Sequence, residues 1–108
     1  MVIFIKDMLM ASNSAQLILS KLTQQKAYIQ EHFDVEKIGL FGSYAKAQEN
    51  DESDLDFYVE FHNKSFDNVA GLWVYLEELY HKKIDLFYRH PNNNHVIFDN
   101  IKKEVIYG

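Results

Sequence analysis

The sequence contains no cysteine, one proline and four glycines among its 108 residues. Without cysteine the chain cannot build a disulfide framework, a thiolate zinc site or a cysteine nucleophile. It has no run of about 18 apolar residues, the length that a transmembrane helix needs. Its five histidines show no HxxxH or HExxH spacing, so a histidine metal site is not expected.

Basic residues are also few, with 11 Lys and Arg against 16 Asp and Glu, and the formal net charge is −5. This balance argues against a protein that binds long nucleic acid through a basic face. Hydrophobic residues make up 47% and aromatic residues 15% of the chain, which is ample for a folded core. At this length we expect one domain with one modest core.

The first ten residues are mostly apolar, but no basic leader precedes them, and Lys6 and Asp7 interrupt them. These features do not fit a signal peptide, so we expect a cytoplasmic protein without a membrane segment. Residues 1–13 are interpreted as an N-terminal extension, either a surface strand or a contact in a homodimer. Residues 14–108 contain no repeat or linker and are interpreted as a single domain.

Caps and hydrophobic periodicity predict a chain order of helix, strand, turn, strand, helix, strand and helix. The expected ranges are, in that order, 12–33, 37–41, 44–47, 54–61, 66–81, 83–89 and 95–106. The inward residues of the three long helices are expected to be Leu17, Leu22, Ile29 and Phe33, then Val69, Leu72, Trp73, Leu76 and Tyr80, then Ile97, Ile101 and Val105. The fold class is therefore α+β, a small mixed β-sheet with helices packed on one side.

Three aspartates fall on one face of two expected strands. Asp54 and Asp56 are two residues apart on segment 54–61, so both carboxylates share its polar face, about 6–7 Å apart at the backbone. Asp85 has the same register on segment 83–89, between two inward residues. If the two strands are neighbours, three carboxylates meet on one patch, where a hard divalent cation relieves their repulsion. This is the ligand set of a two-metal phosphoryl-transfer site.

A phosphate-binding turn is expected at Gly42–Ser43, between a strand and a helix start. Glycine lets the backbone approach a phosphate, the serine offers a hydroxyl, and the helix N-terminus offers free N–H groups. No Walker-type P-loop is present. The combination of Gly-Ser, ten residues and Asp-x-Asp is far more specific than Gly-Ser alone.

This combination resembles the GSx10DxD signature of the DNA polymerase β-like nucleotidyltransferase superfamily. The segment from Lys37 to Ala45, the strand Lys83–Leu86 and the ending Ile101–Gly108 resemble its minimal nucleotidyltransferase (MNT) branch. The usual Gly-Ser-Tyr-Ala-Arg-Gly of that branch appears here with Lys46 and Ala47. Lysine keeps the charge but lacks the bidentate fork of arginine.

The resemblance implies a fold, an activity and a set of roles. ATP is the expected nucleotide, with Gly42, Ser43 and Lys46 at its phosphates. Asp54, Asp56 and Asp85 are the expected Mg²⁺ ligands and catalytic residues, with Asp85 also activating the acceptor hydroxyl. Many stand-alone MNT proteins are antitoxins of an all-helical HEPN ribonuclease toxin, and some transfer AMP to a tyrosine of that toxin.

Two other functions remain open. The domain could neutralise its partner as a non-catalytic binding module, with a vestigial site. It could instead adenylylate a small molecule, as aminoglycoside nucleotidyltransferases do, although those enzymes usually carry an additional helical domain. Glu60 shares the face of the aspartates, and Glu49, Asp51 and Glu52 are interpreted as a solvated loop.

Overall fold

The computed structural model describes residues 13–42, 54–88 and 95–108, with the backbone alone for residue 13 and residues 95–99. Its elements are α2 (Asn13–Phe33), β1 (Val35–Phe41), β2 (Leu55–Phe61), α3 (Phe66–Tyr80), β3 (Ile84–Tyr88), α4 (His95–Glu104) and β4 (Ile106–Tyr107). Residues 1–12, 43–53 and 89–94 are not described. The expected turn at 44–47, the expected loop that contains Glu49, Asp51 and Glu52, and residues 1–12 of the expected extension 1–13 lie there.

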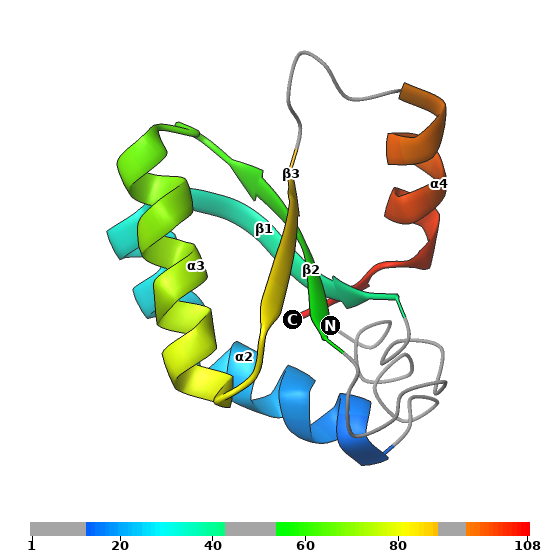
Figure 1. Ribbon diagram of the computed structural model, residues 1–108, viewed down its shortest axis with the longest axis horizontal. Coiled ribbons are helices and arrows are strands. Elements are labelled where there is room, and N and C mark those ends of the chain that lie inside the picture. The colour runs from blue at the N-terminus through cyan, green and yellow to red at the C-terminus, as the bar shows by residue number, and fades with distance from the viewer. Residues whose placement is uncertain (1–12, 43–53, 89–94) are drawn as a thin grey trace.

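The four strands form one mixed sheet in the order β3-β2-β1-β4 (Figure 1). The strand β1 pairs antiparallel with both β2 and β4, whereas β2 and β3 run parallel. The parallel pair is possible because α3 carries the chain from the end of β2 back to the start of β3. The predicted α+β class with a mixed sheet is therefore confirmed.

The core lies between the sheet and the helices α2 and α3. Leu55, Phe57 and Val59 point into it from β2, as the alternation of that strand predicts. The buried cluster comprises Ala15, Ile18, Leu19, Leu22, Ile29, Val35, Ile38, Leu40, Leu55, Phe57, Val59, Leu72, Leu76 and Ile84. Burial of these side chains is the main force that holds both helices on the sheet.

Both ends of α3 show clear capping interactions. Ser65 is its N-cap, with its hydroxyl accepting a hydrogen bond from the Asn68 N–H at 3.2 Å. The helix ends where His81 takes the left-handed conformation and donates its N–H to the Glu77 carbonyl. Trp73, expected in the core, is half-buried, and its indole N–H donates to the Ile84 carbonyl at 2.7 Å.

One inward residue of α2 was predicted wrongly. Leu17 is 73% exposed, while Ala15, Ile18 and Leu19 are buried. The reason is the helical period, because residue 17 lies about 200° around the helix from residues 15 and 19. The first strand also begins earlier than expected, at Val35, which is buried and pairs with Phe61 across an irregularity in the register.

The C-terminal segment differs most from expectation. The last helix ends at Glu104, and Ile106–Tyr107 forms β4 on the free edge of β1 instead of continuing the helix. The helix α4 lies away from α2 and α3 (Figure 1), and its Lys102 ammonium is 3.9 Å from Glu60, which is on the sheet face opposite the core. The helices therefore do not all pack on one side. The expected inward position of Ile97 is outside the described side chains.

That opposite face is partly covered. Tyr58 belongs to it, with Asp56 and Glu60, yet Tyr58 is fully buried. The Tyr107 ring contacts the Tyr58 ring edge-on, and the Tyr58 hydroxyl donates to Glu60 Oε2 at 2.7 Å. The Tyr107 side chain of β4 thus covers Tyr58 on this face, while Asp56 is half-buried.

Candidate active site

The register of the parallel strands brings two of the predicted carboxylates together. Asp56 on β2 and Asp85 on β3 are direct partners in the ladder. Each lies between residues that point into the core, so both carboxylates point to the opposite face. Asp54 precedes β2 by one residue and is half-buried, as is Asp56, while Asp85 is exposed. The two strands are therefore neighbours, as the sequence hypothesis required.

Asp85 and Asp54 act electrostatically on the carboxyl group of Asp56. The pKa of Asp56 is raised from 3.8 to about 6, first by burial, then by the negative charges of Asp85 and Asp54, and by a side-chain hydrogen bond with Asp85. A carboxyl group perturbed by both burial and specific charged neighbours is a candidate functional group. Its environment disfavours the ionised form unless positive charge is supplied.

Gly42 comes close to this cluster at the end of β1. Its φ is +77°, a backbone conformation that residues other than glycine rarely adopt. The preceding residue, Phe41, is the ladder partner of Asp56. A Cβ atom on Gly42 would lie 3.1 Å from Asp56 Cγ and 3.2 Å from Asp56 Cβ. The glycine therefore serves both the turn and the close approach of backbone to carboxylate.

Two of the expected nucleotide contacts, Ser43 and Lys46, lie outside the described residues. Their roles at the phosphates stay predictions. Gly42 is described, and it lies beside Asp56 at the end of β1.

The chemistry of the donor set fits a hard divalent cation, because carboxylate oxygens are the ligands that Mg²⁺ prefers. Within 13–42, 54–88 and 95–108, no three His, Asp or Glu side chains are already arranged around one point as a finished metal centre. What those residues provide is the in-register pair Asp56–Asp85, with the charge of Asp54 acting on it. The metal role of all three residues stays a prediction.

Glu60 shares the face of the carboxylates but is engaged elsewhere. It accepts the Tyr58 hydroxyl hydrogen bond and faces Lys102 of α4. These contacts give it a structural role in holding Tyr58 and α4. We therefore leave it out of the candidate site.

An aromatic contact beside the carboxylates was not predicted from the sequence. The rings of Phe41 and Phe87 meet edge-on, with centroids 6.1 Å apart. Phe41 is paired with Asp56, and Phe87 is two residues after Asp85 on the same face. The alternation of β3 was a signal for Phe87, but its contact with Phe41 depends on the strand order, which the alternation does not give.

None of the helices in the described part of the chain has the length and apolar character to cross a bilayer.

Comparison with known proteins places this arrangement in a family. Residues 23–108 match the family described as polymerase beta, nucleotidyltransferase. A protein of Methanocaldococcus jannaschii that is provisionally named a protein adenylyltransferase is 34% identical over 89 residues, which cover 80% of this chain and 89% of that protein. Protein adenylyltransferase MntA of Thermococcus cleftensis is 32% identical over 99 residues, covering 91% of this chain and 99% of that protein.

Solved structures show the same fold. A structure provisionally described as a minimal nucleotidyltransferase superposes with a TM-score of 0.66 and 22% identity, over 82% of this chain and 93% of that one. A chain in a toxin–antitoxin crystal structure with AMP-PNP superposes with a TM-score of 0.62 and 17% identity, over 78% of this chain and 69% of that one. The chain belongs to the polymerase beta nucleotidyltransferase family.

Proposed function

We propose that this domain is an antitoxin that transfers AMP from ATP, with Mg²⁺, to a hydroxyl group of a partner toxin. The observation that carries the proposal is the in-register pair Asp56–Asp85, with Gly42 packed against the Asp56 carboxylate. The MntA relative is named a protein adenylyltransferase, and one structural neighbour is a toxin–antitoxin complex with an ATP analogue. Both names support the same chemistry.

In this proposal Asp54, Asp56 and Asp85 hold Mg²⁺, and Gly42, Ser43 and Lys46 hold the nucleotide phosphates. The ion, when bound, neutralises the charge of the triphosphate. The acceptor oxygen forms a bond to the α-phosphorus, the bond from that phosphorus to the oxygen bridging to the β-phosphate breaks, and pyrophosphate leaves. Asp85 takes the proton of the acceptor hydroxyl. The contribution of the chain is positioning and electrostatic complementarity to the transferred group.

The partner in this proposal is an all-helical HEPN ribonuclease, with a tyrosine as acceptor. A protein acceptor agrees with the name of the MntA relative, a protein adenylyltransferase. In this proposal the acceptor hydroxyl belongs to the partner.

Transfer can be tested with ATP labelled at the α-phosphate, the neighbouring gene's product and Mg²⁺. We expect label on the partner, no transfer of label from γ-labelled ATP, and loss of transfer in Asp54→Asn/Asp56→Asn. Glu78→Gln, a carboxylate-to-amide change on an exposed position of α3, is the matched control and should transfer normally. If wild-type protein transfers no label while the double variant still neutralises the toxin, the function is masking and the enzymatic proposal fails.

A further inference from the structure

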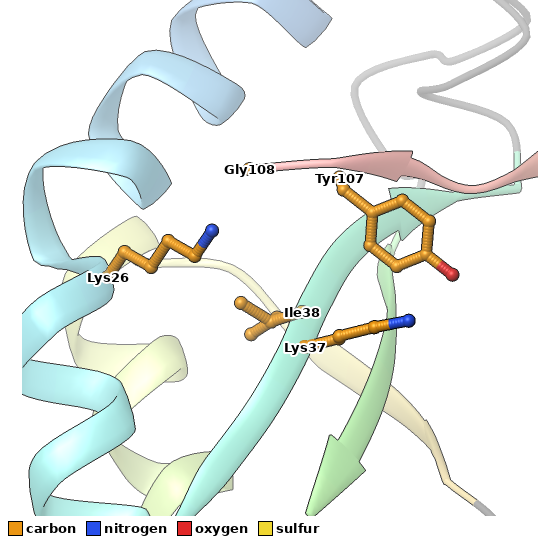
Figure 2. A pocket seen from close by; sticks show the side chains of 5 residues that line it. All are labelled: Lys26, Lys37, Ile38, Tyr107 and Gly108. Carbon is orange, nitrogen blue, oxygen red and sulfur yellow. The ribbon is translucent and has the colours of Figure 1, made fainter. Parts of the chain in front are cut away.

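A cavity of about 350 Å³ lies at the other end of the sheet, where α2 faces β1 and β4 (Figure 2). It is lined by Lys26, Lys37, Ile38, Tyr107 and Gly108. Figure 2 shows Lys26 extending from α2 toward the end of β4, with Ile38 between it and Tyr107. This volume is near the lower end of ligand-binding pockets and suits a few side chains or a small ligand.

The charge of the cavity is opposite to that of the whole chain. The formal net charge is −5, yet among the described residues the charged side chains in the lining are two lysines. Neither lysine has an ion-pair partner within 13–42, 54–88 and 95–108. Burial raises the pKa of Tyr107, and the negative charge of Glu60 raises it further. Glu60 is already engaged by the Tyr58 hydroxyl and by Lys102. The cavity therefore combines an apolar lining with positive charge that no described residue pairs.

The backbone beside the cavity offers a second kind of contact. The strand β4 is the last in the order β3-β2-β1-β4, so among the described strands its outer edge has no partner. A free strand edge can pair with an added extended segment. Lysines beside such an edge disfavour pairing with another basic strand and favour an acidic one.

We propose that this cavity and the β4 edge bind an extended acidic segment of a partner protein. An apolar side chain of that segment packs on the Tyr107 ring, and its flanking carboxylates pair with Lys26 and Lys37. This inference goes beyond AMP transfer, because such binding needs neither nucleotide nor the aspartates.

The test uses the ¹⁵N-labelled full chain and a short peptide of alternating Glu and Leu, followed by amide chemical shifts. We expect shifts concentrated at Ile38, Tyr107 and Gly108. Charge reversal in Lys26→Glu/Lys37→Glu should weaken binding by about tenfold, since it removes two exposed ion pairs and adds repulsion. Lys103→Glu makes the same kind of change on an exposed position of α4 and should bind as the wild type does. Thermal melting of each variant shows that it is folded.

Several results would overturn the inference: no shifts at these amides, equal binding of a Lys–Leu peptide, or undiminished binding by a folded double variant. Weakening by Lys103→Glu to the same degree would also do so, because the attraction would then be general. If inorganic phosphate reproduces the same shifts at the same affinity, the ligand is a free anion and not a peptide. Asp56→Asn should bind the peptide normally, so a failure of AMP transfer and a failure of this inference are distinguishable.

Discussion

The two ends of the sheet carry charges of opposite sign: carboxylates gather at one end and lysines at the other. At the β2–β3 end, strand register holds like charges together, and the pKa of Asp56 rises to about 6. At the β1–β4 end, Lys26 and Lys37 line a cavity to which no acidic side chain of the described residues contributes. Each end is therefore electrostatically incomplete in its own way. One end is suited to a cation and the other to an anion. Glu60, the ladder partner of Lys37, is engaged by the Tyr58 hydroxyl.

The largest expected effect of breaking the acidic end is on catalysis. We expect Asp85→Asn to lower the rate of AMP transfer by at least about 100-fold, since preorganised charge at the reacting group is lost. Initial rates with α-labelled ATP measure the change, and Glu78→Gln is again the control. The variant should still bind the acidic peptide. Transfer at the wild-type rate would remove Asp85 from the site.

Substitutions at two glycines should distort the acidic end and the basic end separately. Gly42 has a φ of +77°, and in Gly42→Ala the new methyl group would clash with the Asp56 carboxylate. In Gly39→Ala the new methyl group would lie 2.8 Å from the Ile106 carbonyl oxygen and 3.0 Å from Tyr107 Cα. Each should lower the free energy of unfolding by about 1–3 kcal/mol, measured by denaturant titration.

The functional consequences of these two variants should differ. Gly42→Ala should lose transfer and keep peptide binding, because only the acidic end is distorted. Gly39→Ala should lose peptide binding, because β4 is displaced from β1. Equal loss of both functions in either variant would show that the two ends are not independent.

A smaller effect is expected from pH on stability. The pKa of Asp56 is about 6 in the folded protein against an ordinary value of 3.8, so the folded state binds the extra proton between these values. The contribution of Asp56 to stability should therefore be greatest below about pH 4 and fall as pH rises to about 6. The expected loss is about 1 kcal/mol, once solvent screening of this half-exposed group is allowed for.

Denaturant unfolding at about pH 4.5 and pH 6.5 in the absence of Mg²⁺ measures this change. Asp56→Asn should remove it, because the amide carries no charge at either pH. The quantity to compare is the difference between wild type and variant, which cancels the other titrating groups. A difference that does not change with pH would mean that Asp56 is not perturbed.

The smallest effect is expected at the ion pair between α4 and the sheet. Lys102 and Glu60 are 3.9 Å apart, and Lys102 is 46% exposed. Lys102→Ala should change the free energy of unfolding by no more than about 0.5 kcal/mol, since exposed pairs contribute little. Both transfer and peptide binding should persist. A loss above about 1.5 kcal/mol would show that α4 is coupled to the sheet more strongly than this contact implies.

Much of the acidic end could be predicted from sequence, because it depends on local rules. Strand alternation placed Asp54 and Asp56 on one face, and a short parallel crossover through α3 brought Asp85 beside them. The Ser65 cap fixed the start of α3 in the same way. These signals lie within a few residues of the groups that they position.

The basic end could not be predicted, because its residues come from separate elements. Lys26 is on α2, Lys37 on β1 and Tyr107 on a strand that was expected to follow a longer helix. Helical periodicity through Ile101 and Val105 favoured that longer helix, but Ile106 and Tyr107 pair with the edge of β1 as a strand. Tertiary pairing overrode the local pattern there, as it did for the buried Tyr58 on a face expected to be polar.

The most direct test of the central claim is the melting temperature with and without Mg²⁺ and ATP together. A ligand that binds the folded site alone raises the melting temperature, by about 5 °C or more for a domain of this size when the site is well saturated. We predict that rise for the wild type and for Glu78→Gln, and its absence in Asp56→Asn/Asp85→Asn. The same rise in the carboxylate variant, or none in the wild type, would contradict the assignment of Asp56 and Asp85 as the metal–nucleotide site.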